Sequence, residues 1–116
     1  MPQLELSSLQ LSQKHLQILQ DLLAACVPDA EVWAYGSRVI GGAHEGSDLD
    51  LVLRNMTDLT QDVVGWIELE EALQNSMLPM LVEVHLWSRL PQAFYPNIAA
   101  IYVVVQEGQG VRHKGD

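Results

Sequence analysis

Residues 32–53 read VWAYGSRVIGGAHEGSDLDLVL, and this stretch decides both the fold class and the position of the candidate site. Aromatic and β-branched residues at its start favour a short strand over residues 31–35. The apolar run at its end predicts a second strand over residues 48–54. Gly36 and Ser37 follow the first strand directly, and a glycine-rich loop leads to the second. The stretch therefore predicts two neighbouring strands with polar residues at their ends.

Asp48 and Asp50 are separated by one leucine at the start of the second predicted strand. Residues at this spacing point to the same face of a strand, with Cα atoms roughly 6.5 Å apart, while Leu49 faces the opposite layer. Two neighbouring carboxylates repel each other unless a cation lies between them, and hard oxygen ligands suit Mg²⁺ or Mn²⁺ better than zinc. The pair predicts a divalent-metal site. The alternative is that both aspartates lie in a solvated loop before a shorter strand.

Gly36 and Ser37 are candidates for binding phosphate. A glycine lets the backbone approach a ligand closely, and N–H groups at the start of a following helical turn can hold phosphate oxygens. The alternative is a tight turn capped by the serine. Because both elements lie at the ends of adjacent strands, the phosphate donors and metal carboxylates should converge. This arrangement favours two metal ions that bridge a triphosphate.

Glu83 is the acidic residue of a third predicted strand, over residues 81–86. By alternation it shares a face with Leu81 and His85. We expect Glu83 to complete the acidic cluster as its third carboxylate.

The rest of the chain predicts helices around these strands. Ser12 is a candidate N-cap for a helix that ends at Cys26, and Asp58 with Gln61 resembles the start of a second helix that runs to about Ser76. Five residues of this second helix are predicted to face inward: Val63, Val64, Ile67, Leu69 and Leu73.

A short helix should begin near Pro91, with a kink or an early stop at Pro96, and a last strand should cover residues 101–106. The predicted fold class is α+β, with a mixed four-stranded sheet and helices packed against it. Residues 1–11 form a leader without assigned structure, residues 12–107 form the domain, and residues 108–116 form a flexible tail.

Composition restricts the class of protein. Six Lys and Arg against fifteen Asp and Glu give the 116 residues a net charge of −9, which disfavours direct nucleic-acid binding and favours divalent cations or a basic partner. The single cysteine, Cys26, excludes an internal disulfide and is expected to be a buried thiol. No apolar run is long enough for a membrane span and the N-terminus lacks signal-peptide features, so we expect a cytoplasmic protein.

Gly36-Ser37, ten intervening residues and Asp48-Leu49-Asp50 resemble the GSx10DxD signature of the DNA polymerase β-like nucleotidyltransferases. The likeness covers roughly residues 12–107, and the chain length is similar to that of the minimal MntA-like antitoxins, which pair with HEPN-domain toxins. The resemblance implies that Gly36 and Ser37 bind nucleotide phosphates. It also implies that Asp48 and Asp50 hold two Mg²⁺ ions, with Mn²⁺ as a substitute. Glu83 would help to bind a metal and would activate the attacking hydroxyl.

The resemblance also implies an activity and a partner. Relatives of this type transfer AMP from ATP to a tyrosine of the partner toxin, an RNase, which is silenced by the added charge and bulk. A hetero-oligomer with that toxin is therefore expected, without direct contact to nucleic acid or membrane.

The sequence departs from the family pattern in several places. Glu83 replaces the usual aspartate, Leu86 replaces a second, non-catalytic aspartate, and His85 is unexpected. We weigh proton transfer against simple packing or solvent exposure for His85. Arg38 either contacts a phosphate or braces the loop through Glu45, and His44 in that loop is expected to face water.

Two other functions are consistent with these residues. In the first, the fold neutralises its partner by binding alone, because the glutamate marks a site that has drifted from catalysis and the acidic surface suits a basic RNase. In the second, the chain transfers nucleotides to a small molecule, as in aminoglycoside-modifying relatives. Those relatives usually carry an additional helical domain, for which 116 residues leave no room.

Overall fold

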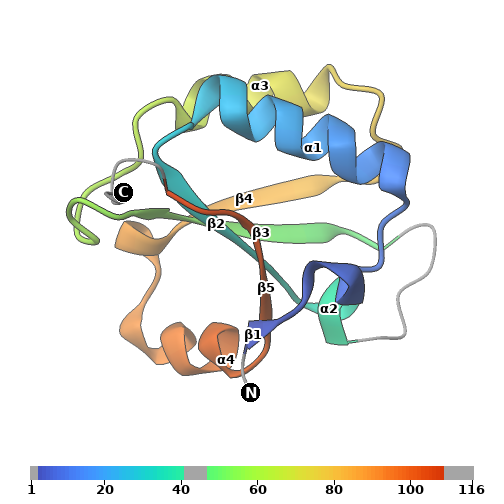
Figure 1. The fold of residues 1–116 in the computed structure, drawn as a ribbon. Helices are drawn as coiled ribbons and strands as arrows, with labels where there is room; N and C mark the ends of the chain where they lie inside the picture. The colour runs from blue at the N-terminus through green and yellow to red at the C-terminus, as the bar shows by residue number, and fades with distance from the viewer. Residues whose placement is uncertain (1–2, 41–46, 109–116) are drawn as a thin grey trace, which may run out of the picture.

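The computed structural model describes residues 3–40 and 47–108. Within them the chain forms one five-stranded sheet, in the order β1-β5-β2-β3-β4, with helices on both faces (Figure 1). In chain order the main elements are β1 (Gln3–Leu4), α1 (Gln13–Cys26), β2 (Ala30–Tyr35), α2 (Ser37–Ile40), β3 (Leu49–Asn55), α3 (Trp66–Gln74), β4 (Val82–Leu86), α4 (Tyr95–Ala100) and β5 (Tyr102–Gln106).

The sheet is mixed, and the α+β class predicted from the sequence is confirmed. Strand β2 runs antiparallel to both β3 and β5, whereas β4 is parallel to β3 and β1 is parallel to β5. The predicted number of strands was too low. The fifth strand, β1, comes from the leader, where Gln3 pairs with Tyr102. Two residues give too short a pattern for a strand to be predicted from sequence.

One face of the sheet is covered by α1 and α3, which lie side by side across it (Figure 1). The main core fills this layer. It contains buried leucines of β3 (Leu49, Leu51 and Leu53) together with Leu19 and Leu23 of α1 and Leu69 and Leu73 of α3. Because alternate residues of a strand face opposite layers, burial of these leucines directs Asp50 to the other face.

The other face carries an aromatic layer next to α4. Trp33 stacks on Tyr102 with ring centroids 3.8 Å apart, and Trp87 stacks on Tyr95 with centroids 4.2 Å apart. The guanidinium of Arg54 lies over the rings of Trp33 and Trp87, and it pairs with Glu31. This layer covers one part of the face and leaves uncovered the part that carries Asp50 and Glu83.

Helix α1 begins as expected, because the side chain of Ser12 accepts a hydrogen bond from the backbone N–H of His15. Helix α3 corrects the prediction, since it begins at Trp66 and not near Asp58. Its N-cap, Gly65, has φ +95°, and a β-carbon there would overlap the backbone carbonyl of Cys26. The close approach to the end of α1 requires this glycine, and because its left-handed backbone is not helical, α3 begins after it.

The late start of α3 changes which side chains are buried. Val63, Leu69 and Leu73 are buried as predicted. Val64 and Ile67 were predicted to face inward, but 90% and 55% of their surfaces are exposed. The helical period assumed for residues 58–76 was wrong at its beginning, because Val64 lies in the turn before the helix.

Pro96 also differs from the prediction. It lies in the first turn of α4 and neither kinks nor ends that helix. Proline is tolerated at this position because its missing N–H would have no helical partner there. A turn of 3₁₀ helix, Gln92–Phe94, precedes α4 and accounts for the helical signal near Pro91.

Two further expectations fall largely on residues that are not described. His44 and Glu45 of the glycine-rich loop lie outside the described residues, as does the tail beyond Gly108. Within the described ranges, no helix is both long enough and apolar enough to cross a membrane.

Candidate active site

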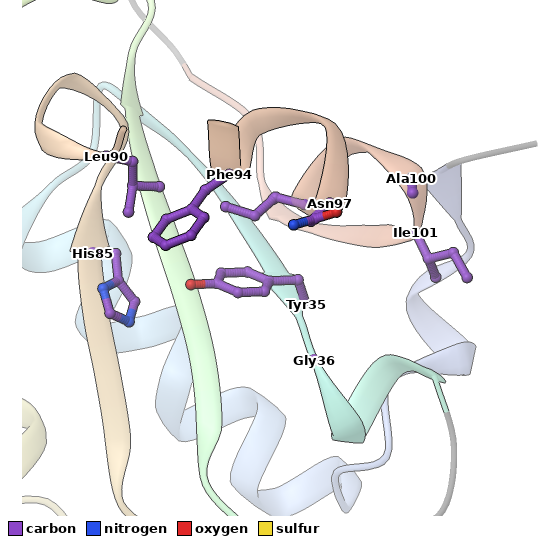
Figure 2. Close-up of a pocket in the computed structure, with 9 residues that line it drawn as sticks. Tyr35, Gly36, His85, Leu90, Phe94, Asn97, Ala100 and Ile101 are labelled. Atoms are coloured by element: carbon purple, nitrogen blue, oxygen red, sulfur yellow. The ribbon is translucent and has the colours of Figure 1, made fainter. Parts of the chain in front are cut away.

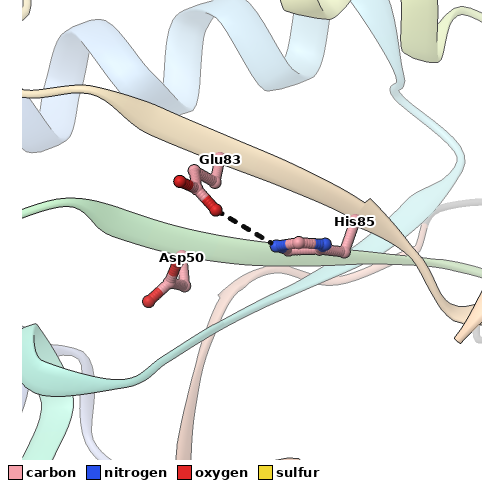
Figure 3. Close-up of side chains that lie close together, drawn as sticks. All are labelled: Asp50, Glu83 and His85. Atoms are coloured by element: carbon pink, nitrogen blue, oxygen red, sulfur yellow. Dashed lines mark ion pairs between the residues drawn. The ribbon is translucent and has the colours of Figure 1, made fainter.

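Asp50 and Glu83 are direct neighbours across the parallel strands β3 and β4. Their carboxylates and the imidazole of His85 lie on the face of the sheet opposite α1 and α3 (Figure 3). One ligand atom from each of the three residues lies within 4.8 Å of the others. The predicted convergence of Glu83 with Asp50 is therefore present in the fold, and it arises from strand register rather than from any local motif.

Asp48 is placed differently from its partner in the motif. It precedes β3, which begins at Leu49, and its side chain is exposed. It is not part of the Asp50, Glu83 and His85 group, although its negative charge helps to raise the pKa of Asp50. Both alternatives for the pair therefore hold in part: Asp48 lies in a solvated segment, while Asp50 lies on the strand.

The electrostatics of the site favour a bound cation. The pKa of Asp50 is raised above its ordinary value, first by burial and then by the charge of Glu83, while His85 acts in the opposite direction. Burial, Asp50 and Glu83 together raise the pKa of Tyr35 to about 12. Concentrated negative charge of this kind is relieved by positive charge placed between the carboxylates.

Gly36 brings the backbone against Asp50. Its φ is +87°, and a β-carbon at this position would lie 2.6 Å from Asp50 Oδ2. Tyr35, the residue before it, pairs with Asp50 across β2 and β3. The bend that opens α2 thus lies next to Asp50, and phosphate binding at this bend stays a prediction. The side chain of Ser37 lies outside the described part of the structure.

Arg38 is buried, with 7% of its surface exposed. Its guanidinium donates hydrogen bonds to the backbone carbonyls of Ser47 and Gln10, at 3.1 Å and 2.7 Å. The N–H of Gln10 in turn donates to the carbonyl of Arg38. Two roles were weighed for Arg38, contact with a phosphate and bracing of the glycine-rich loop. This geometry supports bracing, which Arg38 achieves through hydrogen bonds to backbone carbonyls.

His85 is the member of the group that sequence reasoning did not select as a site residue. Its Nε2 lies 3.6 Å from Glu83 Oε1, and 37% of its side chain is exposed. The signal was present in the sequence, because His85 shares a strand face with Glu83. Nothing in the sequence indicated the distance between the imidazole and Asp50, which belongs to another strand.

A cavity of about 480 Å³ adjoins this group and extends toward α4 (Figure 2). Tyr35, Gly36 and His85 line the end nearest the carboxylates, and apolar side chains such as Leu90, Phe94 and Ile98 line the rest. An aromatic or apolar part of a substrate fits such a cavity while its polar part reaches the carboxylates.

The donor set fits a divalent metal ion. Two carboxylates on paired strand positions, with one pKa raised, supply hard oxygen ligands of the kind that Mg²⁺ and Mn²⁺ bind. Asp50 and Glu83 are the residues that would hold an ion here, with Asp48 at the margin. The bend at Gly36, whose left-handed φ favours glycine, brings the backbone close to the Asp50 carboxylate.

Comparison with known proteins shows the family to which the chain belongs. Residues 12–105 match the family model described as "Nucleotidyltransferase domain". The chain is also 38% identical, over 101 residues, to the "Probable protein adenylyltransferase MntA" of Haemophilus influenzae, and the match covers 87% of each protein. The chain therefore belongs to the nucleotidyltransferase family of transferases and is a minimal, MntA-like member of it.

Proposed function

We propose that this protein transfers AMP from ATP to a hydroxyl group of a partner protein, with divalent metal ions as cofactors. The observation that carries the proposal is the register of Asp50 with Glu83 beside the bend at Gly36. The similarity to a relative described as a protein adenylyltransferase supports a protein as the acceptor.

Each residue of the site has a role in this reaction. The acceptor oxygen attacks the α-phosphorus, a new P–O bond forms, the bond to the β-phosphate oxygen breaks, and pyrophosphate leaves. Glu83 accepts the proton of the attacking hydroxyl as general base. Asp50 and Glu83, with Asp48 at the margin, would hold metal ions, and a bound divalent ion would supply positive charge to the triphosphate. Gly36 lets the phosphates approach the carboxylates.

We further propose that the acceptor is a tyrosine of a HEPN-domain toxin and that the protein acts as its antitoxin. The net charge of −9 suits association with a basic RNase, because opposite charges accelerate and orient encounter. An added AMP places a negative phosphate on the tyrosine, which would oppose binding of an RNA substrate.

The proposal is tested with the purified protein, the product of the neighbouring gene, ATP and Mg²⁺ or Mn²⁺. Intact-mass analysis should show the partner heavier by about 329 Da per AMP unit transferred. Asp50→Asn should abolish the addition, and peptide mapping should locate it on a tyrosine. An unchanged partner mass with both metals would refute the proposal.

A second candidate function is neutralisation by binding alone. Glu83 stands where the family usually has aspartate, and Asp48, although it matches the family motif, lies outside the group formed by Asp50, Glu83 and His85. The Asp48→Asn, Asp50→Asn double variant separates the two functions. If chemistry is required, the double variant loses protection against the toxin while it still binds it. If binding suffices, protection persists.

A further inference from the structure

The imidazole of His85 lies where a metal held by Asp50 and Glu83 would find a third protein ligand. We propose that His85 coordinates this ion through nitrogen, and that the mixed donor set makes the site prefer Mn²⁺ over Mg²⁺. The inference rests on the metal site of the proposed function and adds to it a ligand and a metal preference.

The spacing of the donor atoms suits one ion. Glu83 Oε1 and His85 Nε2 are 3.6 Å apart, too far for a hydrogen bond between them. Two ligand atoms that each lie about 2.1 Å from one ion are about 3.0 Å apart when adjacent and about 4.2 Å apart when opposite. The observed separation falls between these limits. One ligand atom from each of Asp50, Glu83 and His85 lies within 4.8 Å of the others, an upper bound slightly above the larger limit.

The surroundings of His85 leave its imidazole available. Alternation along β4 places it on the same face as Glu83, and its ring centroid lies 6.3 Å from that of Tyr35, at an interplanar angle of 49°. Within residues 3–40 and 47–108 no hydrogen bond to the imidazole is found, and its nearest charged partner is Glu83. Burial is partial, since 37% of the side chain is exposed, so an ion from the solvent can reach the imidazole.

The nitrogen donor changes which metals bind well. Mg²⁺ prefers oxygen ligands throughout, whereas imidazole is a good ligand for first-row transition ions. Affinity within that series is lowest for Mn²⁺, so Mn²⁺ is the least favoured of these ions. The test of nitrogen ligation is therefore the loss of Mn²⁺ affinity, relative to Mg²⁺ affinity, when the imidazole is removed.

The test uses the full-length protein with histidine labelled by nitrogen-15 in the imidazole ring. Pulsed electron paramagnetic resonance of bound Mn²⁺, alone and with α,β-methylene-ATP, should show a coupling to nitrogen-15. The label distinguishes the imidazole from the nitrogens of adenine. His85→Gln should abolish the coupling, while His15→Gln, a change on α1 across the sheet, should keep it.

Affinity gives the second measurement. In titration calorimetry, His85→Gln should weaken Mn²⁺ binding by about tenfold or more, a loss at least as large as that from an altered outer-shell partner. Binding of Mg²⁺ should change little. Bound Mn²⁺ without nitrogen-15 coupling in the unmutated protein would overturn the role of His85 and leave the proposed function standing. Absence of any Mn²⁺ or Mg²⁺ binding, with and without nucleotide, would overturn both.

Discussion

Gly36 lies so close to Asp50 that a β-carbon on the glycine would lie 2.6 Å from the carboxylate oxygen Oδ2. The two residues come from different strands, and Tyr35, just before the glycine, is the residue that pairs with Asp50. The bend proposed to bind phosphate and the carboxylate proposed to bind metal are therefore one structural unit, in which the glycine has both a conformational and a steric role.

Gly36→Ala should impair the site more than the fold. The variant must accommodate a left-handed φ, which costs about 1–3 kcal/mol, and must displace the Asp50 side chain. We expect AMP transfer to fall by about a hundredfold, because displacement of a reactive group by about an ångström has effects of that size. Transfer rates and thermal unfolding measure the two effects.

Gly65→Ala is the matched control, because it strains the backbone at φ +95° on the covered side of the sheet. It should lower stability without a specific change in metal affinity, and equal loss of metal binding in both variants would contradict the assignment.

Asp50→Asn should stabilise the metal-free protein at neutral pH. The pKa of Asp50 is raised in the folded state from its ordinary value of 3.8, so the folded protein binds this proton more tightly than the unfolded chain does. The free energy of unfolding therefore falls as pH rises from 3.8 through the folded-state pKa, and the cost persists at higher pH. The Asp50→Asn variant does not carry this cost, because asparagine has no carboxylate to ionise.

The melting temperatures of the unmutated protein and the Asp50→Asn variant should be compared from pH 3 to pH 8 without metal. The two melting temperatures should be similar at the acidic end of this range. At higher pH the variant should have the higher melting temperature. Added Mn²⁺ should raise the melting temperature of the unmutated protein alone. A variant that is less stable than the unmutated protein at neutral pH would show that Asp50 makes a stabilising contact instead.

Two variants of Glu83 test two properties of its side chain. Glu83→Gln removes the group that accepts the proton, and Glu83→Asp keeps that group on a shorter side chain. Glutamine cannot accept the proton, so we expect the transfer rate to fall by about 10²–10⁴-fold. Aspartate should keep much of the rate, because it is the residue usually found at this position in the family that the sequence resembles. Single-turnover kinetics with the partner protein measure both. Since 45% of the Glu83 side chain is exposed, neither change should unfold the protein, which circular dichroism would check. Comparable activity in all three proteins would exclude Glu83 as the base.

Arg54→Ala should destabilise the aromatic layer beside the site. The guanidinium lies 4.1 Å from the ring centroid of Trp33 and 4.7 Å from that of Trp87, and it pairs with Glu31. Loss of these contacts and of the partner charge should lower the free energy of unfolding by about 2 kcal/mol or more. Arg54→Lys should recover only part of this, because lysine lacks the planar group that stacks on both rings. Urea denaturation provides the measurement, and a change below about 0.5 kcal/mol for the alanine variant would show that the layer is held by its rings alone.

Much of this fold was available from the chain itself. Alternation around Leu49, Leu51 and Leu53 predicted which way the aspartates point, because one strand face must be buried and the other is then polar. Ser12 predicted the start of α1 because its hydroxyl side chain satisfies a free backbone N–H. The start of α3 was not predictable in this way. It depends on a contact between Gly65 and the end of α1, two segments far apart in the sequence.

The chain by itself determined the residue types of the site, their spacing along each strand and the face on which they lie, since these follow from the local geometry of extended backbone. Only the tertiary structure decided that Glu83 pairs with Asp50 across the strands, that a ligand atom of His85 lies within 4.8 Å of one from each of them, and that Asp48 remains at the margin. The physical reason is strand register. Packing of β3 and β4 against α1 and α3 fixes which residues of the two strands pair, and no pattern within either strand specifies that pairing.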